Sequence, residues 1–131
     1  MRLKDKVAVI MGAGQNSGET IGNGRATALR FAQEGARILA VDRSGDLAEE
    51  TARQACATGA DCAAFVADVT REATLQAAMA EAVRRWGRID VLHYNVGISI
   101  EGNDAPVTEI TEAAFDRICR MNFRGAVMRL N

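Results

Sequence analysis

Glycines gather in one short stretch near the start of the sequence and predict a phosphate-binding turn. This stretch holds Gly12, Gly14, Gly18, Gly22 and Gly24. The bare backbone N–H groups of such a turn, together with the positive end of a following helix, can hold a pyrophosphate. The generic GxGxxG pattern is not matched, because Ser17 stands at its last position when it is read from Gly12. The same glycines could instead form only a flexible connector.

An acidic residue stands at a distance from these glycines that favours a dinucleotide. Asp42 follows the apolar run Ile38 to Val41, about twenty residues beyond Gly22. A carboxylate placed there can accept hydrogen bonds from the adenosine ribose, and it would repel a 2′-phosphate, so Asp42 favours NAD over NADP. Arg43 beside it could stack on adenine or partly offset that charge. The alternative is a solvated aspartate that opens a turn.

Polar residues also follow two later apolar runs. Asp68 and Val69 come after one run, and Asn95 and Gly97 come after the next. At the ends of parallel strands such groups can meet an adenine edge or the nicotinamide ribose. Alternatively, Asp68 stabilises the positive end of the helix after it, and Asn95 bonds its own backbone.

Alternating strands and helices would position these residues. The expected strands are Val7 to Met11, Ile38 to Val41, Cys62 to Ala67 and Ile89 to Leu92. The expected helices are Asn23 to Glu34, Leu47 to Thr58, a helix capped by Thr70 that runs to Trp86, and a last helix capped by Thr111. Ser44 or Asp46 can cap the second helix, and Gly35, Gly59 and Gly87 stand where three of them end. The pattern predicts one α/β domain over residues 1–131, a Rossmann-like doubly wound parallel sheet.

Composition excludes several classes of protein. The chain has 131 residues, 48% of them hydrophobic and 25% charged, which is enough for one ordinary core. Its formal net charge of -1 provides no positive field for nucleic acid or for an anionic membrane surface. The apolar runs are too short for a signal peptide or a membrane span, so we expect a cytoplasmic protein.

The cysteines and the single histidine do not form a metal site in this interpretation. Cys56, Cys62 and Cys119 are odd in number, and no two of them form a CxxC pair. Neither a disulfide framework nor a zinc site is predicted, and we expect reduced, packed thiols. His93 is interpreted as a packing residue at a strand end, and the alternative is that it acts as a general acid or base.

Taken together, the motifs resemble the short-chain dehydrogenase/reductase family along the whole chain. Val7 to Gly14 is similar to the first strand and TGxxxGxG turn, Asp68-Val69 to the adenine-binding DV pair, and Tyr94 to Gly97 to the NNAG motif. The resemblance implies an NAD(P)-dependent oxidoreductase of alcohols or carbonyls, with Asn122 at the position of the active-site asparagine. It also implies a cofactor-binding set of Gly12, Gly14, Gly22, Asn23, Asp42, Asp68, Val69, Asn95 and Gly97, while Gly24 would allow close helix packing.

The sequence departs from the family pattern in two regions. Met11 replaces the usual threonine, and an insertion around Gln15 to Thr20 separates Gly12 from Gly22. Residues Thr20 to Gly24 are also similar to the SIAxG turn of the divergent enoyl-reductase branch. In the NNAG motif, Tyr94 stands in place of the first asparagine.

The family's serine, tyrosine and lysine are not supplied by this sequence. Tyr94 is the single tyrosine, and the lysines are Lys4 and Lys6. We therefore expect roughly the N-terminal half of a subunit, truncated after about four strands and the following helix and inactive by itself. Its fourth strand would have an open edge, and Ile118, Met121 and Val127 would face water.

Two other functions remain open from the sequence. The chain could be a non-catalytic nucleotide-binding or oligomerising module, complete at 131 residues, whose open edge a partner chain covers; we expect a homo-oligomer. A methyltransferase that uses S-adenosylmethionine would have a similar architecture. It is disfavoured because Val7 to Met11 contains no acidic residue before the glycines.

Overall fold

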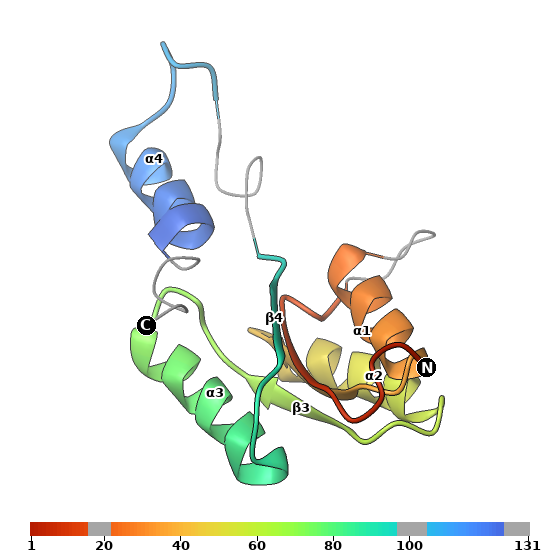
Figure 1. Cartoon of the computed structure of the whole chain (residues 1–131). Helices are drawn as coiled ribbons and strands as arrows, with labels where there is room; N and C mark the ends of the chain where they lie inside the picture. The colour runs from red at the N-terminus through yellow and green to blue at the C-terminus, as the bar shows by residue number, and fades with distance from the viewer. Residues whose placement is uncertain (16–21, 97–104, 125–131) are drawn as a thin grey trace.

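Four parallel strands form one sheet that carries helices on both faces (Figure 1). This computed structural model describes residues 1–15, 22–96 and 105–124. The strands are β1 (Val7–Met11), β2 (Arg37–Asp42), β3 (Cys62–Val66) and β4 (Val91–Tyr94), in the order β3-β2-β1-β4. The helices are α1 (Asn23–Gln33), α2 (Gly45–Cys56), α3 (Glu72–Trp86) and α4 (Glu112–Cys119), and a π-helical turn, Arg120–Arg124, follows α4.

The two faces of the sheet bury separate halves of the core. Residues alternate between the faces of a strand, so Ala8 and Ile10 pack with α1 and α2, while Val9 and Met11 pack with α3. All five residues of β1 are buried, as expected for a central parallel strand covered on both sides. The predicted doubly wound α/β architecture is confirmed.

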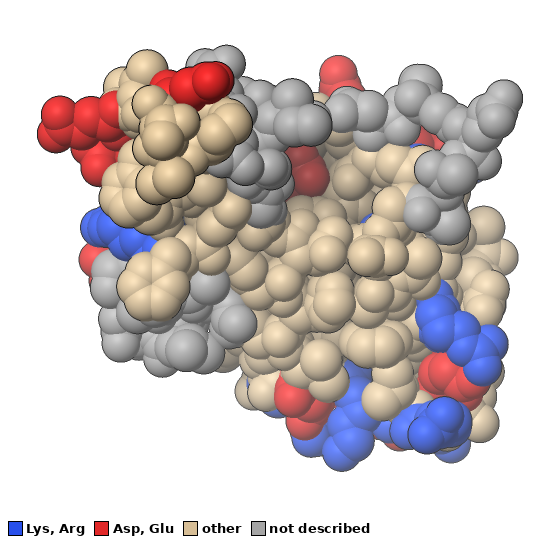
Figure 2. All heavy atoms as spheres, turned by 90° about the horizontal axis from the view of Figure 1, so that it is seen from above, with Lys and Arg blue, Asp and Glu red and all other residues tan. Residues whose placement is uncertain are grey.

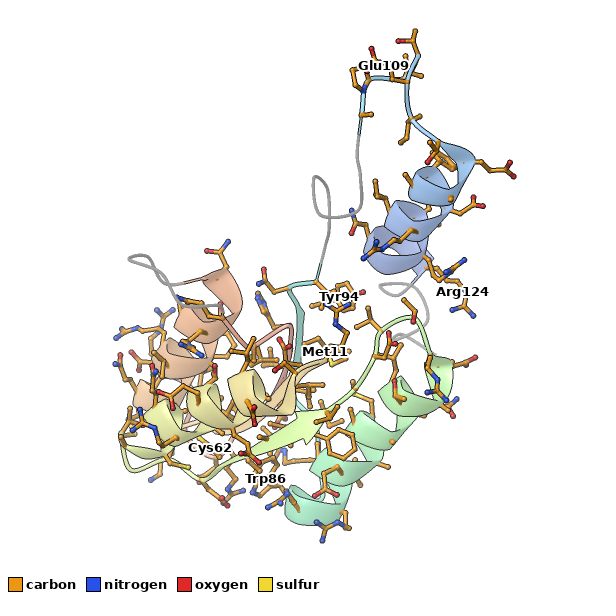
Figure 3. All side chains as sticks on the ribbon, turned by 180° about the vertical axis from the view of Figure 1, so that it is seen from behind. Met11, Cys62, Trp86, Tyr94, Glu109 and Arg124 are labelled. Carbon is orange, nitrogen blue, oxygen red and sulfur yellow. The ribbon has the colours of Figure 1, made fainter. Side chains whose placement is uncertain are left out.

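The register of the strands brings their carboxyl ends to one edge. Met11 pairs with Val41 of β2 and with Tyr94 of β4, and Asp42 pairs with Val66 of β3. Met11 and Tyr94 lie side by side in Figure 3. The residues that follow each strand therefore meet at one edge of the sheet, where ligands of open α/β sheets bind.

Most of the predicted helix ends are confirmed. Ser44 caps α2 by accepting the Leu47 N–H at 3.4 Å, and Thr111 caps α4 by accepting the Ala114 N–H at 3.1 Å. Beyond α1, α2 and α3 the chain turns at three glycines with positive φ: Gly35, Gly59 and Gly87. A side chain is strained in that conformation, which explains the glycines there.

The predicted cap of α3 is wrong. The helix begins at Glu72 after Arg71, and Thr70 lies outside it. The Thr70 hydroxyl instead donates to Asp68 Oδ1 at 2.6 Å, a local side-chain hydrogen bond outside the helix.

The fourth strand lies two residues later than predicted. The N–H of Asp90 donates to Val7 O, and its carboxylate accepts the Val7 N–H, each at 2.9 Å. Ladder pairing with β1 thus begins only at Val91, opposite Ala8, and continues through His93 and Tyr94. The apolar run in the sequence ends at Leu92, but pairing with β1, not the apolar run, determines where β4 begins and ends.

Beyond β4 the described chain continues in α4 and the π-helical turn. Among the described residues, β4 pairs with β1 alone and leaves its other edge open. The large apolar side chains exposed here are Val107 at 90%, Phe115 at 55% and Phe123 at 71%, whereas Ile118 is half-buried. Val127 lies outside the described residues, as does the side chain of Met121. No helix in the described ranges combines the length and apolar character needed to span a bilayer.

Candidate cofactor-binding site

The turn after β1 is tied to the end of β2. The N–H groups of Gly12 and Ala13 both donate to Val41 O, at 2.8 and 3.0 Å, and the Gly14 N–H donates to Asp42 Oδ2 at 2.9 Å. Gly12 has a φ of 77°, and a Cβ on Gly14 would lie 2.6 Å from the Leu47 Cβ. Glycine is required at both positions, and the turn has a fixed backbone rather than that of a flexible connector.

The first turn of α1 packs directly against this turn. A Cβ on Gly24 would collide with Gly12 O, and a Cβ on Gly12 would collide with Asn95 O. The side-chain Nδ2 of Asn95 would lie 3.1 Å from the same Gly24 Cβ. The predicted close packing at Gly24 is confirmed, and it brings the ends of β1 and β4 and the start of α1 together.

The N-terminus of α1 can attract an anion. Its first turn carries no acidic residue and its N-cap, Gly22, offers no side-chain cap. Each of the other α-helices in the described ranges has an acidic residue in its first turn. The N–H groups of Asn23 and Gly24 lack a partner within the helix by its geometry, and the Gln15 side chain accepts the Gly22 N–H. An uncapped, acid-free helix start of this kind suits a phosphate.

Asp42 is the last residue of β2 and lies beside the glycine turn. Besides the Gly14 N–H, its carboxylate accepts the Ser44 N–H, through Oδ1 at 3.0 Å. Both oxygens retain lone pairs after these bonds, since a carboxylate offers about four acceptor sites. The interpretation of Asp42 as a solvated turn residue does not explain its bond to Gly14, which lies 28 residues away in the sequence.

Asp68 and Arg43 lie close together after β3 and β2. The Thr70 hydroxyl holds the pKa of Asp68 below its usual value, and the Thr70 N–H and the charges of Arg43 and Arg71 act in the same direction. The Arg43 side chain is exposed. Val69 is 6% exposed and packs into the core on the α3 face.

The remaining predicted residues lie along the chain after β4. Asn95 is exposed, and its N–H donates to Met11 O at 2.9 Å. Gly97 lies outside the described residues. Asn122 is exposed in the π-helical turn, and Arg124 of that turn donates to Thr70 O at 3.4 Å (its side chain is labelled in Figure 3). The structure thus gathers Gly12, Gly14, Asp42 and Asn95, and places the turn that holds Asn122 near the end of β3.

Thr51 and its partner Arg25 at this site were missed by sequence reasoning. Thr51 of α2 is fully buried, donates to Ala13 O at 2.8 Å and accepts from Arg25 Nε at 2.8 Å. The sequence could have indicated Thr51, because it is the polar residue on a helix face that otherwise consists of alanines. The buried residues of this face are Ala48, Thr51, Ala52 and Ala55. A hydroxyl at such a position needs a buried partner.

Cys56 and Cys62 lie at the end of α2 and the start of β3, and His93 lies in β4 opposite Ile10. Cys56 is exposed, so the expectation that all thiols are packed is wrong for this residue. It ends α2, where its Sγ contacts Cys62 O at 3.5 Å. His93 is half-buried in β4, and within the described residues its Nε2 has no hydrogen-bond partner, which agrees with a packing role.

Charge is sparse over the middle of the face onto which the strand ends open. Figure 2 looks onto the end of the molecule at which the chain leaves β4, and it shows mostly uncharged atoms there, with Lys and Arg side chains toward the rim. A surface of this kind suits a bound organic molecule better than an extended polyanion.

Fold and site together define a Rossmann-like α/β domain with a glycine turn at the carboxyl edge of its sheet. Within that class, the chain belongs to the short chain dehydrogenase family, whose model matches residues 6–130. It is 37% identical to levodione reductase of Leifsonia aquatica over an alignment of 131 positions, which covers 98% of this chain and 46% of that protein.

Solved structures of related enzymes share the fold. NAD+-bound xylitol dehydrogenase superposes with a TM-score of 0.83 at 30% identity, over 99% of this chain and 47% of that one. A dehydrogenase from Burkholderia cenocepacia with bound NADP gives a TM-score of 0.85 at 32% identity, over 98% of this chain and 47% of that one. The chain spans about half the length of the relatives it matches.

Proposed function

We propose that this chain is the NAD-binding part of an oxidoreductase that transfers hydride between a nicotinamide cofactor and a small alcohol or carbonyl. The observation that carries the proposal is the position of Asp42. Its carboxylate ends β2 and is bonded to the glycine turn through the Gly14 N–H. One acidic group is thus fixed beside the backbone that would hold a diphosphate, as recognition of an adenosine ribose requires.

The residues present fit such a cofactor. The space that a Cβ would fill at Gly12, Gly14 and Gly24 is closed, so only bare backbone lies along the turn, and α1 begins there without a cap. The turn, the N-cap Gly22 and the first residue of α1, Asn23, would hold the diphosphate. Asp42 would bind the ribose, Arg43, Asp68 and Val69 the adenine, and Asn95 and Gly97 the nicotinamide ribose. The nicotinamide supplies the hydride chemistry when bound, and these residues hold and orient it.

The charges at the strand ends support NAD rather than NADP. A 2′-phosphate on the ribose would lie next to the Asp42 carboxylate, which costs electrostatic free energy. Arg43 is the cation beside it, and its charge already acts on Asp68, so it is only partly available to offset a phosphate. Related structures hold either cofactor, so the choice of cofactor rests on these side chains.

Residues other than those that would bind the cofactor would carry out the reaction itself. Asn122 would be the catalytic residue that this chain contributes, through the turn that contacts Thr70 O. No tyrosine is followed four residues later by a lysine in this sequence, so we expect no carbonyl reduction by the chain alone. The small-molecule substrate and the homo-oligomer are parts of the same proposal.

A second candidate function is a nucleotide-binding or oligomerising module without catalysis. The observation that favours it is the single tyrosine, Tyr94, which lies in β4 and packs into the core on the α3 face. That module would bind the same nucleotide, so cofactor binding alone does not distinguish the two candidates. Turnover of an alcohol or carbonyl substrate by a longer form of the protein would distinguish them.

A titration of the chain with NADH and NADPH tests the proposal. We expect saturable binding of one molecule per chain, tighter for NADH, with ADP-ribose competing because it presents the same adenosine and diphosphate groups. Binding that NADPH dominates would overturn the cofactor assignment. The absence of saturable binding of either nucleotide would overturn the proposed function itself.

A further inference from the structure

Thr51 is the one fully buried polar side chain among the described residues, and it lies at the boundary of three elements. It projects from the middle of α2, whose neighbouring buried residues are alanines. Its hydroxyl donates to Ala13 O of the glycine turn and accepts from Arg25 Nε of α1, both at 2.8 Å. Both bonding directions of one buried hydroxyl are therefore in use.

The two partners of Thr51 are the segments that flank the candidate diphosphate position. Ala13 is the middle residue of the glycine turn, and its N–H already donates to Val41 O. Arg25 directly follows Gly24, the residue that packs against Gly12 in the first turn of α1. A single hydroxyl from a third element thus links the turn to the start of the helix.

Arg25 depends on this hydroxyl. Its Nη2 is buried and has no hydrogen-bond partner in the described part of the chain, so Nε is the guanidinium donor with a described bond. A guanidinium that loses its acceptor in a partly buried place is costly and tends to move toward water. Loss of the Thr51 hydroxyl would release the Arg25 side chain and the Ala13 carbonyl together.

We propose that Thr51 is a positioning residue for the cofactor: by holding Ala13 and Arg25 it sets the spacing between the glycine turn and the start of α1, and so the fit of a diphosphate between them. The inference rests on the proposed function, because it assigns a role at the same site. It predicts more than a loss of stability. Disturbing this link should weaken binding of the diphosphate even in a fully folded chain.

Three substitutions separate positioning from stability. Thr51→Val has nearly the same shape without the hydroxyl, and Thr51→Ser keeps the hydroxyl without the methyl group. Thr58→Val is the matched control, since the Thr58 hydroxyl also bonds a backbone oxygen, Ala55 O at 2.7 Å, but at the far end of α2. For each chain we would measure NADH affinity at a temperature where circular dichroism shows a full fold, and the melting temperature without ligand.

We expect Thr51→Val to weaken NADH binding about tenfold, which corresponds to about 1.4 kcal/mol of binding free energy lost through the displaced turn. Thr51→Ser should restore most of the affinity, and Thr58→Val should leave it unchanged. In the ligand-free chain, hydrogen–deuterium exchange of the peptide that covers the glycine turn should become faster in Thr51→Val but not in Thr58→Val.

Two results would overturn the inference. Thr51→Val with a lower melting temperature but wild-type NADH affinity and unchanged exchange in the turn would mean that Thr51 only stabilises the fold. Equal losses of affinity in Thr51→Val and Thr51→Ser would exclude the hydroxyl as the cause. If the wild-type chain binds neither NADH nor NADPH, the proposed function fails instead, and the exchange experiment still shows whether Thr51 fixes the turn.

Discussion

Asp42→Asn separates the two roles of this carboxylate. In the ligand-free chain Asp42 accepts the Gly14 N–H through Oδ2 and the Ser44 N–H through Oδ1. The asparagine amide keeps one oxygen acceptor, so one of these two bonds is lost together with the charge. We expect a loss of about 1–2 kcal/mol in the free energy of unfolding, the range for one hydrogen bond to a partly exposed charged group.

The effect on binding differs between the two nucleotides. A ribose hydroxyl that donates to the Asp42 carboxylate contributes about 1–3 kcal/mol, so Asp42→Asn should weaken NADH binding about 5- to 150-fold. For NADPH the same change removes a repulsion, which for two unit charges 4 Å apart is about 4 kcal/mol at an effective dielectric constant of 20. The preference for NADH over NADPH should therefore fall by at least about tenfold.

Fluorescence titration with both nucleotides measures this preference directly, and chemical denaturation of the same samples measures stability. Asp46→Asn is the matched control, because Asp46 lies in the exposed first turn of α2 and loses the same charge. The reasoning would be refuted if Asp42→Asn weakened NADH and NADPH equally. It would also be refuted if Asp46→Asn changed the preference as much as Asp42→Asn.

Three further predictions concern packing, pH and thiol chemistry. Gly24→Ala places a Cβ against a backbone oxygen and should lower the free energy of unfolding by about 1–3 kcal/mol in urea titrations; an unchanged midpoint would contradict the close packing. The hydrogen bond from the Thr70 hydroxyl lowers the pKa of Asp68 in the folded chain. This bond therefore stabilises the fold fully above the ordinary carboxyl pKa of about 4, and the stabilisation is lost as the pH falls through the pKa of Asp68 in the folded chain. The stability gap between wild type and Thr70→Val should thus be constant from pH 7 to about pH 5 and shrink below about pH 4, which denaturation at each pH checks; a gap that widened in acid would refute this sign. Burial, with the adjacent Cys56 thiol, raises the pKa of Cys62 to about 12, so iodoacetamide at about pH 8 should label exposed Cys56 first, and peptide mass spectrometry showing the reverse would contradict it.

The strands and most helix ends could be predicted because local signals agree with tertiary packing there. Val7–Met11 is apolar throughout and buried throughout, so its sequence boundaries coincide with those of β1. Gly35, Gly59 and Gly87 stand where the backbone needs a positive φ, which is a local requirement that a sequence displays directly.

The errors arose where a distant partner decides the local structure. The start of β4 depends on pairing with β1, which the apolar run from Ile89 could not reveal. The cap of α3 is the exception, because the Thr70 hydroxyl donates to a carboxylate only two residues away, that of Asp68. Thr51 was missed because its partner Ala13 lies 38 residues away in the sequence, and its role follows only from the packing of α2 against the glycine turn.

The candidate site was predictable to a similar degree. The sequence places Gly12, Gly14, Asp42 and Asn95 after successive strands, and a parallel sheet brings such positions to one edge. The contacts among them, such as Asp42 with the Gly14 N–H, depend on strand register and turn geometry that spacing alone does not determine. Gly97 lies outside the described residues, and the cofactor and catalytic roles of all the site residues, Asn122 and Val69 included, stay predictions.

The most direct test of the central claim is to map where NAD+ binds on the isotope-labelled chain by nuclear magnetic resonance. Backbone amide shifts should change in a saturable way in the turn Gly12–Gly14, in the first turn of α1 and at Asp42, Asp68 and Asn95, with little change at the opposite ends of the strands. Shift changes confined to other surfaces, or none at millimolar NAD+, would contradict a dinucleotide site at the carboxyl edge of this sheet.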